Sequence, residues 1–115
     1  MKRVIVESPY AGDVRGNERY ARACMKDCLH RGEAPFASHL LYTQPGVLDD
    51  TVPAERTLGI EAGLAWAEAT ELVGVYTDRG VTPGMQLGID RHREQGRTVE
   101  ERQLPWHLQK EGGVR

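Results

Sequence analysis

The chain has few of the features that mark membrane, disulfide-rich or nucleic-acid-binding proteins. It contains only two cysteines in 115 residues, its formal net charge is −2, and no apolar run approaches the length of a membrane span. The apolar start before Glu7 is too short for a signal peptide. Arg91, Arg93 and Arg97 stand among acidic residues, which is typical of a solvated surface rather than a nucleic-acid footprint. We therefore expect a cytoplasmic protein, in the host cytoplasm if a phage encodes it, without direct membrane or nucleic-acid binding.

The two cysteines offer little chemistry. Cys24 and Cys28 are four residues apart in a helical pattern, so their thiols lie on consecutive turns and a disulfide between them would constrain little. No pair of histidines stands nearby to complete a metal site. We expect reduced core thiols, no bound metal and no cofactor.

Length and pattern indicate one domain with a short tail. We place an α/β domain at 1–104 and a tail at 105–115, where an exposed Trp106 would suit a protein contact. There are no repeats and no low-complexity segments. The patterns predict strands at 3–7, 34–39, 72–76 and 97–104, and helices at 17–30, 53–70 and 83–95.

The helix starts and faces carry further expectations. Asn17 is the expected N-cap of the first helix, and Thr82 followed by Pro83 is the expected start of the third. The middle helix, 53–70, is apolar on more than one side, so we expect it to be substantially buried.

The alternation of strands and helices predicts a three-layer α-β-α fold, with a Rossmann-like parallel sheet of about four strands. In such folds ligands bind beyond the carboxyl ends of the strands. Three loops should therefore meet there: 8–17, 39–50 and 77–84.

These loops hold residues suited to a sugar, a base or a phosphate. Hydroxyl groups, an arginine, a histidine and a glycine at a helix start can contact such ligands. An ordinary surface loop, a helix cap and a structural histidine explain the same residues equally simply. The candidate ligand-binding residues are Ser8, Tyr10, Arg15, Asn17, His39, Thr82, Gly84 and Gln86.

Three carboxylates are candidates for acid–base chemistry. Glu7 and Asp78 follow the first and third predicted strands, near the expected site. Glu61 lies in the apolar segment GIEAGLAW, where an unpaired charge is costly, so it is either an exposed stripe of the helix or an acid with a raised pKa.

The stretches VIVESPYAGDVRGN, GIEAGLAWAEATELVGVYTD and GMQLGI resemble the nucleoside 2-deoxyribosyltransferase-like superfamily, which includes deoxynucleoside monophosphate N-hydrolases and many small phage proteins. The resemblance implies a nucleoside or nucleotide ligand and a homodimer or higher homo-oligomer. It also implies sugar-phosphate contacts from Ser8, Tyr10 and Arg15. In this family a helix glutamate attacks the sugar, but Gln86 stands at that place and lacks an anionic oxygen.

Two functional interpretations follow. In the first, the protein binds a nucleoside or nucleotide and cleaves or transfers its N-glycosidic bond with a non-standard acid from among Glu7, Glu61 and Asp78, of which we expect Glu61 to handle the proton. In the second, it is a non-catalytic binder that sequesters or senses a nucleotide-derived signal, as a phage anti-defence protein would.

Overall fold

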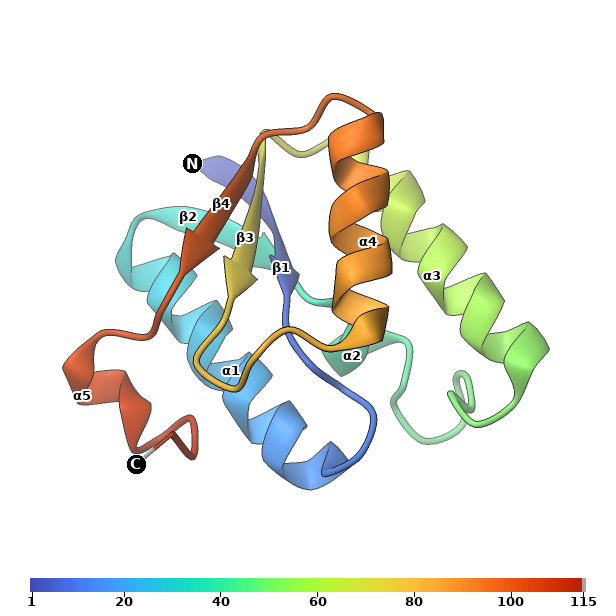
Figure 1. The fold of residues 1–115 in the computed structure, drawn as a ribbon, viewed down its shortest axis with the longest axis horizontal. Coiled ribbons are helices and arrows are strands. Elements are labelled where there is room, and N and C mark those ends of the chain that lie inside the picture. Colours follow the sequence, from blue (N-terminus) through green and yellow to red (C-terminus); the bar gives the residue numbers. More distant parts are fainter. Residues whose placement is uncertain (115) are drawn as a thin grey trace.

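A four-stranded, all-parallel sheet forms the centre of the protein (Figure 1). The computed structural model describes residues 1–114. Neighbouring strands pair in parallel along the order β2-β1-β3-β4. The predicted fold class is therefore confirmed. The strands are β1 (Lys2–Glu7), β2 (Glu33–Phe36), β3 (Leu72–Tyr76) and β4 (Val99–Arg102).

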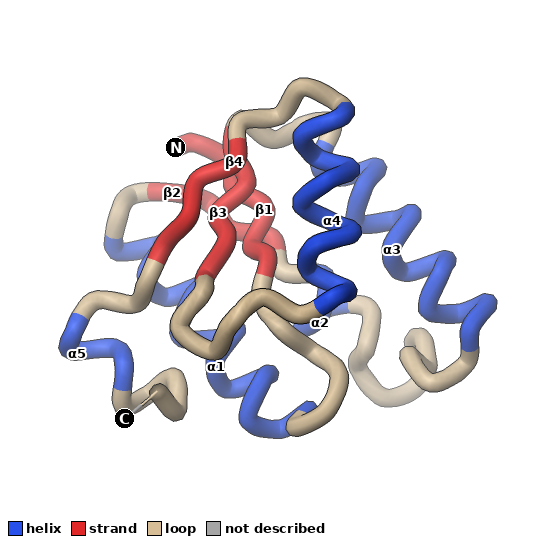
Figure 2. Tube along the Cα trace, in the orientation of Figure 1, coloured by secondary structure: helices blue, strands red, loops and turns tan. Residues whose placement is uncertain are grey.

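Helices cover both faces of the sheet, which gives the three layers (Figure 2). On one face α1 (Val14–His30) packs against β1 and β2, and α5 (Trp106–Gln109) packs against α1. On the other face α4 (Pro83–Glu94) contacts β1 and β4, with α3 (Pro53–Ala67) beyond it. The short α2 (Ser38–Leu41) follows β2. Within residues 1–114, no helix has both the length and the apolarity to cross a membrane.

The protein has two apolar cores, one on each face of the sheet, and the alternation of side chains along β1 explains them. Val4 and Val6 of β1 belong to the apolar cluster under α1, while Ile5 between them belongs to the cluster under α4. This follows from the two-residue repeat of a strand. Cys24 and Cys28 are free and buried in the first cluster, so the prediction of core thiols is confirmed.

The expected N-cap of the first helix is wrong. The helix α1 begins at Val14, and the cap is Asp13, whose side chain accepts a hydrogen bond from the Gly16 N–H. Asn17 is buried instead, and its Nδ2 donates to the carbonyls of Tyr10 and Ala11. It therefore fixes the loop that leads into the helix.

The expectation that the middle helix is substantially buried is also wrong. Of the residues in α3, only Ala67 is buried, whereas Leu58, Ile60 and Trp66 are 55%, 43% and 57% exposed. The cause is the narrow sheet: α4 already covers its central strands, and α3 stands beyond α4 at the margin (Figure 1). An apolar pattern on several sides of a helix does not by itself show that the same chain buries those sides.

The tail after Leu104 packs onto the domain. Leu108 of α5 is 1% exposed and belongs to the core cluster under α1. The Arg19 side chain donates to the carbonyls of Lys110 and Glu111 at 2.7 Å each. Trp106 itself is 76% exposed. This segment therefore closes one end of the first core.

Candidate functional site

A cavity of about 520 Å³ opens at the carboxyl ends of β1 and β2, between the sheet, α3 and α4. Connections leave β1 and β3 toward opposite edges of the sheet, because β2 and β4 are the outer strands. Ligands of open α/β sheets bind at such a switch point, here between β1 and β3, and the cavity lies beside it at the end of β1. The polar residues that line the cavity are Glu7, Ser8, Tyr10, Ser38, His39, Asp50, Arg56, Thr82, Arg91 and His92.

Glu7 is the carboxylate that the structure fixes most firmly in this cavity. The buried His92 lies with its Nε2 3.0 Å from a Glu7 carboxylate oxygen, and its Nδ1 accepts a hydrogen bond from Arg97 Nε. Because Nδ1 is occupied as an acceptor, the ring proton is on Nε2, which donates to Glu7. A Cβ at Gly88 would lie 3.2 Å from both Glu7 oxygens, so the bare backbone of α4 lets the carboxylate lie against it.

Tyr10 and His39 form an aromatic pair at the edge of the cavity. Their ring centroids are 4.9 Å apart and their planes differ by 17°. Burial lowers the pKa of His39, and the nearby Arg56 adds to this effect while Glu7 and Asp50 oppose it. The His39 ring is therefore neutral at pH 7 and offers a flat, polar surface beside Tyr10.

The start of α4 forms another wall of the cavity. Thr82 caps the helix by accepting a hydrogen bond from the Met85 N–H, as its sequence predicts. The Gln86 N–H donates to the Thr82 carbonyl, and Pro83 has no N–H. In residues 1–114 the Gly84 N–H is thus the one donor of this turn without a partner in the chain.

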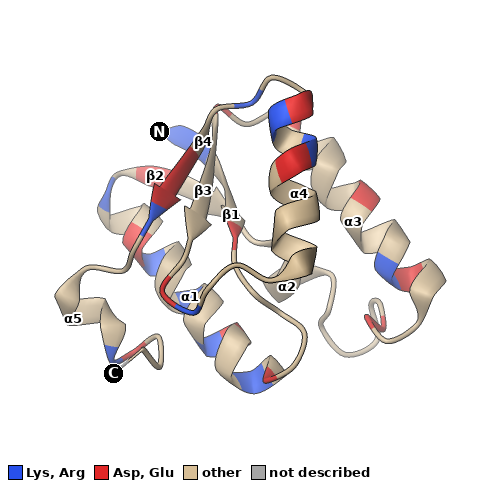
Figure 3. Ribbon diagram, viewed as in Figure 1, with Lys and Arg blue, Asp and Glu red and all other residues tan. Residues whose placement is uncertain are grey.

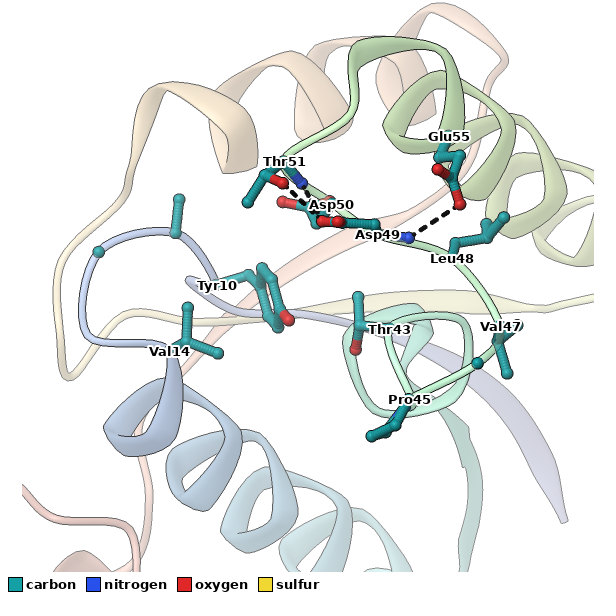
Figure 4. Close-up of a pocket in the computed structure, with 13 residues that line it drawn as sticks. Tyr10, Val14, Thr43, Pro45, Val47, Leu48, Asp49, Asp50, Thr51 and Glu55 are labelled. Atoms are coloured by element: carbon teal, nitrogen blue, oxygen red, sulfur yellow. Dashed lines mark hydrogen bonds between the residues drawn. The ribbon is translucent and has the colours of Figure 1, made fainter.

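A second, more open hollow of about 760 Å³ adjoins the first and shares Tyr10, Ala11, Gly12 and Asp50 with it. Figure 4 shows Tyr10 pointing toward the loop that carries Thr43 and toward Asp50. Two of its acids are already engaged: Asp49 accepts from Thr51, and Glu55 accepts from the Asp49 N–H. The smaller cavity holds the fixed carboxylate and the helix start, so it is the stronger candidate.

Residues 2–102 match the family model described as "Domain of unknown function (DUF7768)". The chain belongs to this family. Neither the curated proteins nor the solved structures give a significant match. The family description names no activity, so the function of this DUF7768 domain has to be inferred from its site.

The DUF7768 domain brings together most of the candidate ligand-binding residues. Glu7, with Ser8, Tyr10, His39, Thr82 and Gly84, lines the cavity. Asn17 does not line it, but it supports the loop that holds Tyr10. The three expected loops therefore contribute to one site, although the third contributes only its last three residues, Thr82, Pro83 and Gly84.

Besides Asn17, four candidates lie outside both cavities. Arg15 is exposed on α1, and Glu61 is exposed on α3. The Gln86 amide donates to Asp90 on the outside of α4. The Asp78 carboxylate accepts hydrogen bonds from the Tyr20 hydroxyl at 2.6 Å and from the Leu104 N–H, so it joins β3 to the segment after β4. Its position indicates a structural role.

Arg56, Arg91 and His92 also line the cavity, although none of them was among the predicted site residues. The two arginines look like ordinary surface charges, and Figure 3 shows that charge on α4 gathers toward its carboxyl end. A spacing signal does exist: Gly84, Gly88 and His92 recur every four residues, which places them on one helix face. Among residues 1–114, no group of three His, Cys, Asp or Glu side chains is placed to hold a metal ion.

Proposed function

We propose that this DUF7768 domain binds a nucleoside or nucleotide in the cavity at the carboxyl ends of β1 and β2. The observation that carries the proposal is the meeting of Glu7 and Ser8 with the start of α4 and the Tyr10–His39 pair. A carboxylate and a hydroxyl suit sugar hydroxyl groups, and stacked aromatic rings suit a base. The resemblance to nucleoside 2-deoxyribosyltransferase-like proteins supports the same ligand class and remains part of the proposal.

Titration calorimetry with ribo- and deoxynucleosides and their monophosphates tests this proposal. We expect saturable binding of at least one of them. Tyr10→Ala should weaken it about tenfold, because stacking of a base on an aromatic ring contributes about 1–3 kcal/mol. Trp106→Ala is the matched control, since Trp106 is exposed on α5 and lines neither hollow. If no nucleoside or nucleotide binds, the proposal is wrong.

A second candidate function is cleavage or transfer of the N-glycosidic bond of this ligand. Glu7 favours it, because the His92 bond and the Gly88 backbone hold this carboxylate in the cavity. In a direct hydrolysis Glu7 accepts a proton from the attacking water while the bond between sugar and base breaks. The base leaves with the bonding electron pair and takes up a proton, so that a free sugar and a free base result.

Release of free base, followed by chromatography, distinguishes an enzyme from a binder. If the second candidate is right, Glu7→Gln abolishes release, while Glu61→Gln and Asp78→Asn retain it because these side chains line neither hollow. If every bound ligand is recovered unchanged, the domain is a binder that sequesters or senses its ligand, as an anti-defence protein would.

We also propose that two copies associate through α3. Leu58 and Trp66 on α3 are large apolar side chains that are more than half exposed, and Leu87 on α4 is exposed as well. A two-fold axis would place each α3, with its exposed apolar side chains, against its own copy.

A further inference from the structure

Arg56 of α3 reaches across the cavity to the start of α4. A Cβ at Gly84 would lie 3.3 Å from Arg56 Nη2, so the guanidinium stands directly over the first turn of that helix. Within residues 1–114, the Arg56 side chain forms no ion pair and donates no hydrogen bond. Asp50 lines the same cavity, but its carboxylate is not within ion-pair distance of the Arg56 guanidinium.

This position is electrostatically unfavourable for a cation. The amino end of a helix carries a partial positive charge that favours anions and disfavours cations. The Gly84 N–H is the remaining free donor of this first turn, and the guanidinium lies against the same residue. Arg91, from the third turn of α4, lines the same cavity and also lacks an ion pair among the described residues. Two arginines and a helix start thus meet around one space.

A buried polar group in the same cavity also lacks a partner. Ser8 is 1% exposed, and its hydroxyl is the only buried side-chain polar atom in residues 1–114 that has no hydrogen bond. Buried hydroxyl groups are nearly always hydrogen-bonded in folded proteins, because leaving one unpaired costs free energy. Ser8 therefore indicates that a polar ligand atom completes this cavity, independently of the charges around Gly84.

We propose that Arg56 and the start of α4 form an anion subsite, and that Arg56 makes the domain select a phosphorylated ligand over its neutral counterpart. The inference rests on the proposed function, since it assigns the phosphate of a nucleotide to this end of the cavity. A phosphate oxygen there accepts from the Arg56 guanidinium and the Gly84 N–H and offsets the positive end of α4. The sugar then lies toward Ser8 and Glu7.

Calorimetric titration of a nucleoside and its 5′-monophosphate, side by side, tests the subsite. We expect the monophosphate to bind about 10- to 100-fold more tightly, the range for a hydrogen bond to a charged group. Arg56→Gln should remove this advantage and leave the affinity for the nucleoside unchanged. Arg93→Gln is the matched control, because it removes the same charge from an exposed position on α4 outside the cavity.

The outcomes separate the two proposals. If the nucleoside and the monophosphate bind equally well, or if Arg56→Gln weakens both alike, the anion subsite is wrong while the proposed function stands. If neither binds, the proposed function is wrong, and inorganic phosphate then tests the subsite alone by phosphorus NMR. Phosphate binding that Arg56→Gln abolishes and Arg93→Gln retains supports the subsite, and absence of phosphate binding overturns it.

Discussion

Among individual residues, the buried ion pair of Arg102 and Glu33 has a large role in stability. The guanidinium, 2% exposed, donates to both carboxylate oxygens of Glu33 at 2.7 Å. In the exposed pair of Arg3 and Glu71, with side chains 60% and 42% exposed, two guanidinium nitrogens donate to one carboxylate oxygen. Loss of one partner of a buried pair leaves an uncompensated charge and costs about 3–5 kcal/mol, whereas an exposed pair contributes less than about 1 kcal/mol.

We therefore expect Arg102→Met to lower the free energy of unfolding by about 3 kcal/mol or more and Arg3→Met by less than about 1 kcal/mol. Urea denaturation measures both. Adding Glu33→Met to Arg102→Met should restore most of the loss, because no buried charge then remains unpaired. A double variant as unstable as Arg102→Met alone would contradict this explanation and would indicate that the packing of Arg102 over Gly74 matters more.

Among individual residues, the sequence also predicts some members of the site and not others. Glu7 and Ser8 could be predicted because the carboxyl end of a central parallel strand has a known position in the fold. Asp78 follows a strand too, but it is directed away from the site by Tyr20 and Leu104, which are distant in sequence. The position of Glu61 depends on the rotation of α3 about its axis, and a helix that is apolar on several sides does not specify it.

Among the secondary-structure elements, α3 differs most from its prediction, and its exposure leads to a test. Leu58→Glu should raise the dissociation constant of a dimer by at least about 100-fold, since each copy would lose the burial of one large apolar side chain. Its effect on the monomer should be small, because Leu58 is 55% exposed there. Leu29→Glu is the matched control: Leu29 is 53% exposed but lies on α1, on the opposite face.

Sedimentation over a range of protein concentrations measures this association. The proposed interface is wrong if the wild-type protein sediments as a monomer throughout, or if Leu29→Glu dissociates it as strongly as Leu58→Glu does. The exposed apolar side chains of α3 could not be recognised from the sequence, because the apolar pattern of a helix is the same whether a sheet or another copy of the chain covers the helix.

For the whole molecule, the fold class followed directly from the sequence. Apolar β-branched segments alternate with helical periods, and this order favours a parallel sheet with helices on both faces. Parallel strands end at the same rim, so the loops that would meet were predictable as well. The cavity was not, because its walls depend on how α3 and α4 are rotated and on long side chains such as Arg56 that cross between them.

The stability of the whole molecule should fall in two steps as the pH is lowered. Burial lowers the pKa of His39 from its ordinary value of 6.5, so the unfolded chain binds more protons below about pH 6.5 and the folded state loses stability there. The Arg102 hydrogen bond lowers the pKa of Glu33 from 4.5, so the stability that this pair contributes is lost only as the pH falls below about 4.5.

Melting temperatures between about pH 7.5 and pH 3 should therefore show both decreases. His39→Gln removes a group that titrates near neutral pH, so it should reduce the upper decrease and leave the lower one. Glu33→Gln should act in the opposite way, at the cost of a lower melting temperature at every pH because Arg102 loses its charged partner. If the upper decrease is unchanged in His39→Gln, the neutral, half-buried His39 beside Tyr10 is not what makes the fold sensitive to mild acid.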